Sequence, residues 1–246
     1  MIYRVTHNLD HVDRFNDFDA ELIQFENSGG INYALPGFPY ERYAPKVMTF
    51  VGNLPRLVGT DFPHTNPTLP MMSMKMLLAC LSVGAFPYEL HPTRIYSAEL
   101  KTQELSELQD MTDASVFSEK FFNVHLTTWT DAVDLERTLL AKRDPSQPRA
   151  ARKYLVYTAA QAEDPGDLDL EAVERLSLNV PEDQLPGLFR MEQLHGLFCA
   201  EKTKQACEGA GIVGVTFAPV PVPMGQGVRP YLSGFRFVSD DDLAVF

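Results

Sequence analysis

The stretch LHGLFCAEKTKQACEGAGIVGVTFAPV (residues 194–220) decides the fold class. Its first seven residues predict a strand, Glu201–Glu208 predicts a short helix that ends at Gly209 or Gly211, and Ile212–Val220 predicts another strand. Along the whole chain, helices and strands mix without the regular alternation of βαβ units, which is typical of α+β proteins. We therefore predict an α+β fold of mixed, mainly antiparallel sheets with a few packed helices.

The glycines of this stretch, Gly209, Gly211 and Gly214, match the G-x-G-x-x-G pattern of dinucleotide-binding proteins. That site requires a strand before the glycine turn and a helix after it, so that the helix N-terminus faces the pyrophosphate. Here the predicted order is inverted, with a helix leading in and a strand leading out. The glycines are therefore interpreted as a helix end and a tight turn, and no nucleotide cofactor is expected.

Outward from this stretch, short runs rich in β-branched and aromatic residues predict further strands. These strands cover residues 2–5, 88–96, 120–126, 153–158 and 188–191. Residues 162–174 are acidic and predict a turn with an exposed flank.

Two stretches predict helices. Met71–Val83 is apolar on nearly every side, which is typical of a buried helix, with Pro70 suited to its first turn and Gly84 ending it. Asp131–Arg143 carries acids early, spaced apolar residues and basic residues at its end, which complement a helix dipole.

The chain has 246 residues, enough for one large domain or two small ones. No apolar run reaches the roughly 20 residues that a membrane span needs, and the start lacks the pattern of a secretion signal. An odd cysteine count without C-x-x-C favours neither disulfides nor structural zinc. We expect a cytoplasmic protein without membrane contact, metal or cofactor, whose Cys80, Cys199 and Cys207 fill apolar space.

The net charge is −12, from 33 acidic and 21 basic residues. Nucleic-acid binding draws most of its affinity from lysine and arginine on phosphates, so this balance argues against a nucleic-acid partner. It favours a cationic protein partner, whose encounter rate electrostatic attraction would raise. Solubility alone also accounts for an acidic surface in many proteins.

A metal-dependent hydrolase or nuclease is the alternative function. His7 and His11 are four residues apart, as two zinc ligands on one helix face would be, and Glu99-x-Lys101 resembles the end of a nuclease metal motif. However, Asn8 stands where a catalytic glutamate would follow the first histidine, and no basic groove is evident. We therefore expect a polar loop around His7 and an exposed strand end at Glu99.

Three segments, taken as a set, resemble immunity protein family eleven of bacterial polymorphic toxin systems. They are PYELHPTRIYS (Pro87–Ser97), KFFNVHLTTWTDAVDLERT (Lys120–Thr138) and Leu185–Val220, in the order and approximate spacing of that family. The resemblance implies one immunity-type domain over 1–246 and leaves open a variable N-terminal subregion over 1–70. One departure is Ala200, which stands where a serine-like helix cap is expected and cannot accept an amide hydrogen bond.

The resemblance implies an antidote that binds a cognate toxin and neutralises it without catalysis; it sets no oligomeric state. If the toxin acts on an anionic substrate, its site is basic, and an acidic inhibitor can occupy that site. Tyrosine often anchors such interfaces, and carboxylates at the rim set the association rate. The expected contacts are therefore acidic residues and two tyrosines: Asp10, Asp13, Asp17, Asp19, Tyr40, Tyr43, Glu163, Asp164, Asp167, Asp169, Asp240, Asp241 and Asp242.

Overall fold

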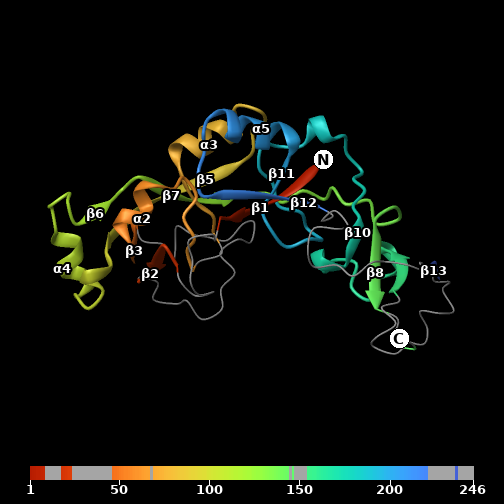
Figure 1. Cartoon of the computed structure of the whole chain (residues 1–246), viewed down its shortest axis with the longest axis horizontal. Coiled ribbons are helices and arrows are strands. Elements are labelled where there is room, and N and C mark those ends of the chain that lie inside the picture. Colours follow the sequence, from red (N-terminus) through yellow and green to blue (C-terminus); the bar gives the residue numbers. More distant parts are fainter. Residues whose placement is uncertain are drawn as a thin grey trace.

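A computed structural model of the chain describes residues 1–8, 18–23, 46–66, 69–143, 146, 154–220 and 236–237. The described strands form three sheets, and helices pack against them (Figure 1). Most strand pairs are antiparallel. The pair β3 (Met48–Gly52) with β5 (Tyr88–Ser97) is parallel, and so is β13 (Arg236–Phe237) with β9 (Tyr154–Thr158). The predicted α+β class is thereby confirmed.

The central sheet is built from strands of residues 194–220 and from the N-terminal strand. β1 (Ile2–His7) lies between β11 (Phe198–Ala200) and β12 (Val215–Val220) and pairs antiparallel with both. Helix α5 (Glu201–Gly209) connects the two outer strands. The predicted strand, helix and strand are confirmed, although both strands are shorter than predicted. β11 begins just after Gly196 and β12 just after Gly214, and both glycines have a positive φ that interrupts extended backbone.

Ala200 is the N-cap of α5 and makes no side-chain capping bond, as the sequence indicated. The first helical amide, on Glu201, donates instead to the carbonyl of Met1 at 3.1 Å. The start of the chain therefore satisfies one of the free amides at the helix N-terminus, but not the N2 or N3 amide that a serine cap would satisfy.

Two hydrophobic clusters lie on either side of this central sheet, because alternate residues of a strand face opposite ways. Tyr3, Val5 and Cys199 belong to one cluster, with the buried side of helix α3 (Met74–Leu81). Ile2, Phe198 and Ala200 belong to the other, with residues in and beside β8 (Leu139–Arg143) and β9. The N-terminal strand therefore joins two cores that come from distant parts of the sequence.

A larger sheet contains the strands between residues 20 and 126. Its order is β2-β3-β5-β7-β4, with β6 also paired to β5. Phe50, Ile95 and Phe121, from three different strands, are fully buried in one cluster. The strands are β2 (Ala20–Leu22), β3 (Met48–Gly52), β4 (Met71–Ser73), β5 (Tyr88–Ser97), β6 (Phe117–Ser118) and β7 (Phe121–Leu126).

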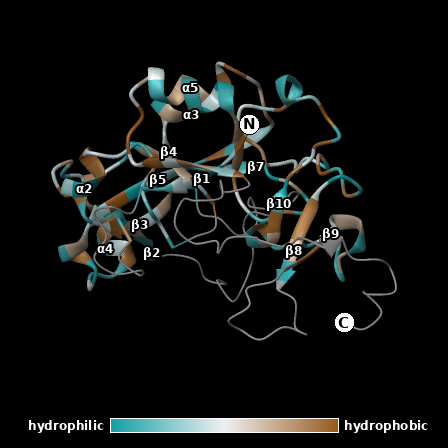
Figure 2. Cartoon of the chain, turned by 45° about the vertical axis from the view of Figure 1, so that its right-hand side comes forward, coloured by the Kyte–Doolittle hydropathy of each residue, from teal (hydrophilic) through white to brown (hydrophobic). Residues whose placement is uncertain are grey.

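The third sheet overturns the predicted helix at Asp131–Arg143. Its order is β10 (Val173–Arg175), β8 (Leu139–Arg143), β9 (Tyr154–Thr158) and β13 (Arg236–Phe237). The hydrophobic start of β8 is buried against the second cluster (Figure 2). Helix propensities are weak, so pairing with β9 and β10 outweighed the helical charge pattern.

The predicted helix at Met71–Val83 is confirmed in its body but begins later. Residues Met71–Ser73 form β4, and helix α3 spans Met74–Leu81. Ser73 caps the helix: its Oγ accepts from the Met76 amide at 3.2 Å and donates to the buried Asp61 carboxylate at 2.7 Å. The apolar pattern continues across this cap because the strand and the helix are both buried.

We expect Ser73→Ala to lower the free energy of unfolding by about 1–2 kcal/mol, since it removes the helix cap and the hydroxyl partner of buried Asp61. Chemical denaturation of the full chain measures the change. Ser106→Ala, at an exposed position of helix α4 (Leu105–Asp110), is the matched control and should stay within about 0.5 kcal/mol of the parent. Equal effects of the two substitutions would contradict the capping role.

The cysteines are free and buried, as predicted. Cys80 of α3 and Cys207 of α5 lie with their Sγ atoms 3.8 Å apart, where the two helices pack. The remaining described helix is the short α2 (Leu54–Val58). None of the helices in the described part of the chain is both long and apolar enough to cross a membrane.

Candidate functional site

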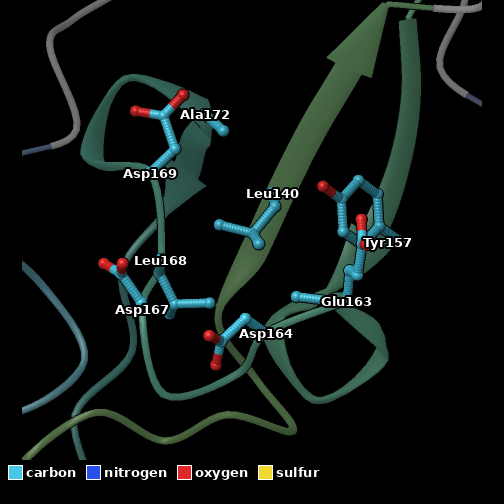
Figure 3. A pocket seen from close by; sticks show the side chains of 9 residues that line it. Leu140, Tyr157, Glu163, Asp164, Asp167, Leu168, Asp169 and Ala172 are labelled. Carbon is cyan, nitrogen blue, oxygen red and sulfur yellow. The ribbon is translucent and has the colours of Figure 1, made fainter.

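A pocket of about 530 Å³ lies beside β8 and β9. Leu140 and Tyr157 face each other across the ladder of these two strands and form one wall. The loop over residues 162–172 forms the rest of the lining. Figure 3 shows the Leu140 and Leu168 side chains near the middle of the pocket, with acidic residues around them.

Local hydrogen bonds hold this loop in shape. Asp164 accepts from the Gly166 amide at 3.0 Å, in a turn that contains Pro165. Asp169 accepts from the Glu171 amide at 2.9 Å and caps the 3₁₀ turn Leu170–Ala172. Asp side chains favour such turns because they bond their own backbone two residues further on. The loop therefore presents its carboxylates in a defined arrangement.

Leu168 anchors the loop to the second core. Its side chain is buried, and its amide donates to the carbonyl of Gln193 at 2.8 Å. Because a strand-like stretch alternates its side chains, burial of Leu168 turns its neighbours Asp167 and Asp169 outward, and both are exposed.

The pocket has a strongly negative rim. Glu163, Asp164, Asp167 and Asp169 are all exposed, and none of the described residues that line the pocket is basic. Burial raises the pKa of Tyr157, and the nearby Asp169 carboxylate raises it further. The pocket therefore combines an apolar centre with clustered acceptors, which suits a lysine or arginine side chain with its aliphatic stem and charged head.

A histidine of the protein itself lies beside this rim. The Nε2 atom of His195 is 3.0 Å from a carboxylate oxygen of Asp167, and both side chains are exposed. An exposed pair of this kind contributes little stability. Asp167 can therefore exchange His195 for a more strongly basic partner.

The structure brings four of the predicted contact residues together at this pocket: Glu163, Asp164, Asp167 and Asp169. The other predicted contacts, except Asp19, lie outside the described residues: Asp10, Asp13, Asp17, Tyr40, Tyr43, Asp240, Asp241 and Asp242.

Asp19 has a structural position instead. It is only 2 % exposed, and its carboxylate accepts from the His64 amide at 2.9 Å. Its carbonyl accepts from the amide of Asn53. The expectation that Asp19 is an exposed contact is therefore corrected: it joins two loops next to β2.

The described residues proposed for a metal-dependent hydrolase or nuclease do not come together in the structure. His7 ends β1 and stacks on Phe62, whereas Glu99 lies in the exposed 3₁₀ turn Ala98–Leu100 and Lys101 pairs with Glu21 at 2.6 Å. His11 lies outside the described residues. Within the described part of the chain, the group of side chains suited to a metal ion is a different one, formed by Glu89, His91 and His125.

His7 makes stability depend on pH. Burial lowers its pKa from 6.5 to about 4, although its contact with the Phe62 carbonyl acts in the opposite direction. Below pH 6.5 the unfolded chain binds a proton that the folded chain does not bind, so stability falls until pH reaches about 4. The loss attributable to His7 is on the order of 3 kcal/mol.

We therefore expect His7→Gln to flatten the fall in the free energy of unfolding between pH 6.5 and 4, compared with the parent chain. Denaturation at several pH values in this window measures the two slopes. Parallel curves would show that another group causes the loss.

Sequence reasoning found the acidic rim but missed the wall and centre of the pocket. The sequence predicts a helix at Leu140, and it predicts a strand at Tyr157 without indicating which strand pairs with it. Leu168 and Leu170 alternate with acidic residues, a pattern that predicts apolar side chains turned inward, but it does not show that Leu168 is the one that is fully buried. The pairing of Leu140 with Tyr157 has no local signal, since strand register is set by tertiary contacts.

No protein-family model and no curated protein matches this chain. The resemblance to immunity protein family eleven therefore stays a prediction from the sequence segments alone.

Proposed function

We propose that this protein is an immunity protein that binds a cognate bacterial toxin and neutralises it without catalysis. The observation that supports it most is the acidic pocket, where exposed carboxylates selected from the sequence as partner contacts lie around an apolar centre. The net charge of −12 gives a cationic partner a long-range attraction to the molecule.

In this proposal, a basic side chain of the toxin enters the pocket beside Leu140 and Tyr157. Its aliphatic part contacts the leucines, and its charged end contacts the rim carboxylates. Charge-assisted hydrogen bonds of this kind are stronger than neutral ones. A toxin that works on an anionic substrate carries such basic residues in its own site, so the immunity protein would cover the residues that the substrate needs.

Co-expression tests the proposal directly. The gene beside this one is expected to encode the toxin, and producing that toxin alone should arrest growth. Producing both proteins should restore growth and yield a complex that co-purifies. Neither rescue nor a complex, with both proteins present and soluble, would refute the antidote function.

A further inference from the structure

Three potential metal ligands share one face of the large sheet. Glu89 and His91 are two residues apart on β5, so their side chains leave the same face. His125 lies on β7 directly opposite Glu89 in the antiparallel ladder. Directly opposite residues have Cβ atoms about 5 Å apart, so the strand pairing itself brings the three side chains together.

The ligand atoms converge on a small volume. One carboxylate oxygen of Glu89 is 3.5 Å from His125 Nδ1 and 3.9 Å from His91 Nε2. All three ligand atoms lie within 4.8 Å of one another. Two ligands on one tetrahedral zinc ion, each about 2.0–2.1 Å from it, lie about 3.3 Å apart. The Glu89 oxygen is already close to this spacing, so the remaining difference lies mainly between the two imidazole nitrogens. A small rotation of the His91 side chain, the more exposed of the two imidazoles, is the adjustment that would close it.

Burial is graded across the group. The His125 side chain is 2 % exposed, the His91 side chain 15 % and the Glu89 side chain 50 %. The two imidazoles are held by the sheet, while the carboxylate stands at the solvent side. An ion can enter from solvent and meet two imidazoles that the strands already hold near each other, which lowers the ordering cost of binding.

Asn123 adds a polar group to the same face, directly opposite His91 in the ladder. It is fully buried, and its amide nitrogen donates to the sulfur of Met48 at 3.2 Å. Among the described residues its Oδ1 has no hydrogen-bond partner. A buried oxygen of this kind can accept from a water molecule on the ion, and ligands around metal sites are commonly supported in this way.

We propose that Glu89, His91 and His125 bind one divalent transition-metal ion, with zinc the best match. Two imidazoles and one carboxylate form a known zinc ligand set that leaves a fourth position for water. The proposal is independent of toxin binding and replaces the expectation of a metal-free protein. It uses none of His7, His11, Glu99 or Lys101.

Zinc titration of the chelator-treated full chain tests the site. Isothermal calorimetry with zinc chloride should give one ion per chain, and zinc should raise the Tm, because a ligand of the folded state stabilises it. Glu89→Gln should weaken zinc binding about tenfold or more and abolish most of the Tm shift. This position is exposed, so the variant should fold; His91→Gln should have the same effect.

Two control variants make the outcome decisive. Glu107→Gln removes an exposed glutamate of α4, and His195→Gln removes the exposed histidine beside Asp167; both should bind zinc like the parent chain. Absence of stoichiometric zinc binding by the parent would overturn the proposal. An unchanged zinc affinity in Glu89→Gln and His91→Gln would also overturn it. A loss of zinc affinity in His195→Gln instead would do the same, since the ion would then lie elsewhere.

Discussion

Gly187→Ala is expected to lower the free energy of unfolding by about 3 kcal/mol, as severe overpacking does. A Cβ at Gly187 would lie 2.1 Å from the Cys80 carbonyl oxygen and 2.7 Å from that of Gly84. Both obstacles are backbone atoms at the end of α3, so no side-chain rotation can relieve them. The Gly187 amide also donates to the Gly84 carbonyl at 2.9 Å, and this bond would be strained.

Denaturant unfolding of the full chain measures this loss. Gly209→Ala is the matched control, because a Cβ at that last position of α5 meets nothing within 4 Å. Alanine is a better helix former than glycine, so the control should be neutral or gain up to about 1 kcal/mol. If both variants were equally stable, the close backbone contact at Gly187 would not be what holds α3 to the 185–189 segment.

Neutralising the acidic pocket is expected to slow association with the toxin about tenfold at low salt, because attraction between opposite charges mainly sets the association rate. The salt dependence of that rate should weaken as well. Surface plasmon resonance at several salt concentrations measures both effects. The variant combines four substitutions: Glu163→Gln, Asp164→Asn, Asp167→Asn and Asp169→Asn.

The amide side chains keep the fold intact, since asparagine at 164 and 169 still offers an oxygen to the amides of Gly166 and Glu171. The matched control removes the same charge from another exposed stretch, with Glu104→Gln, Glu107→Gln, Asp110→Asn and Asp113→Asn. If both quadruple variants slowed association equally, net charge would matter and the pocket would not. If the toxin bound normally to the pocket variant, the proposed antidote function would not be refuted, but the toxin would contact another surface of the protein.

The candidate pocket could be predicted in its charge but not in its shape. Asp164-Pro165-Gly166 is a local turn signal, and the acids around it follow from their own turn chemistry. The hydrophobic wall depends on Leu140 meeting Tyr157 across a ladder, and neither residue specifies the other. The helical charge pattern of 131–143 was misleading, because exposed charges contribute much less free energy than buried strand pairing.

The proposed metal ligands, too, could be predicted only in part, because the sequence does not show which strands pair. Glu89-Leu90-His91 has the spacing of two side chains on one strand face, which the sequence shows. His125 is more than thirty residues further on, and only the register that places it opposite Glu89 makes it a third ligand. A shift of one residue would turn it to the other face of the sheet.

By itself, the sequence determined the elements whose causes are local. The helix at 201–209 with its glycine end, the strands at 88–97, 121–126 and 154–158, and the acidic character of 163–169 all follow from neighbouring residues. The tertiary structure decided which strands pair with each other. It also decided that residues 139–143 form a strand and not a helix, and that Asp19 is buried. Those outcomes depend on burial against residues far away in the chain, whose free energy exceeds the small local preferences that a sequence displays.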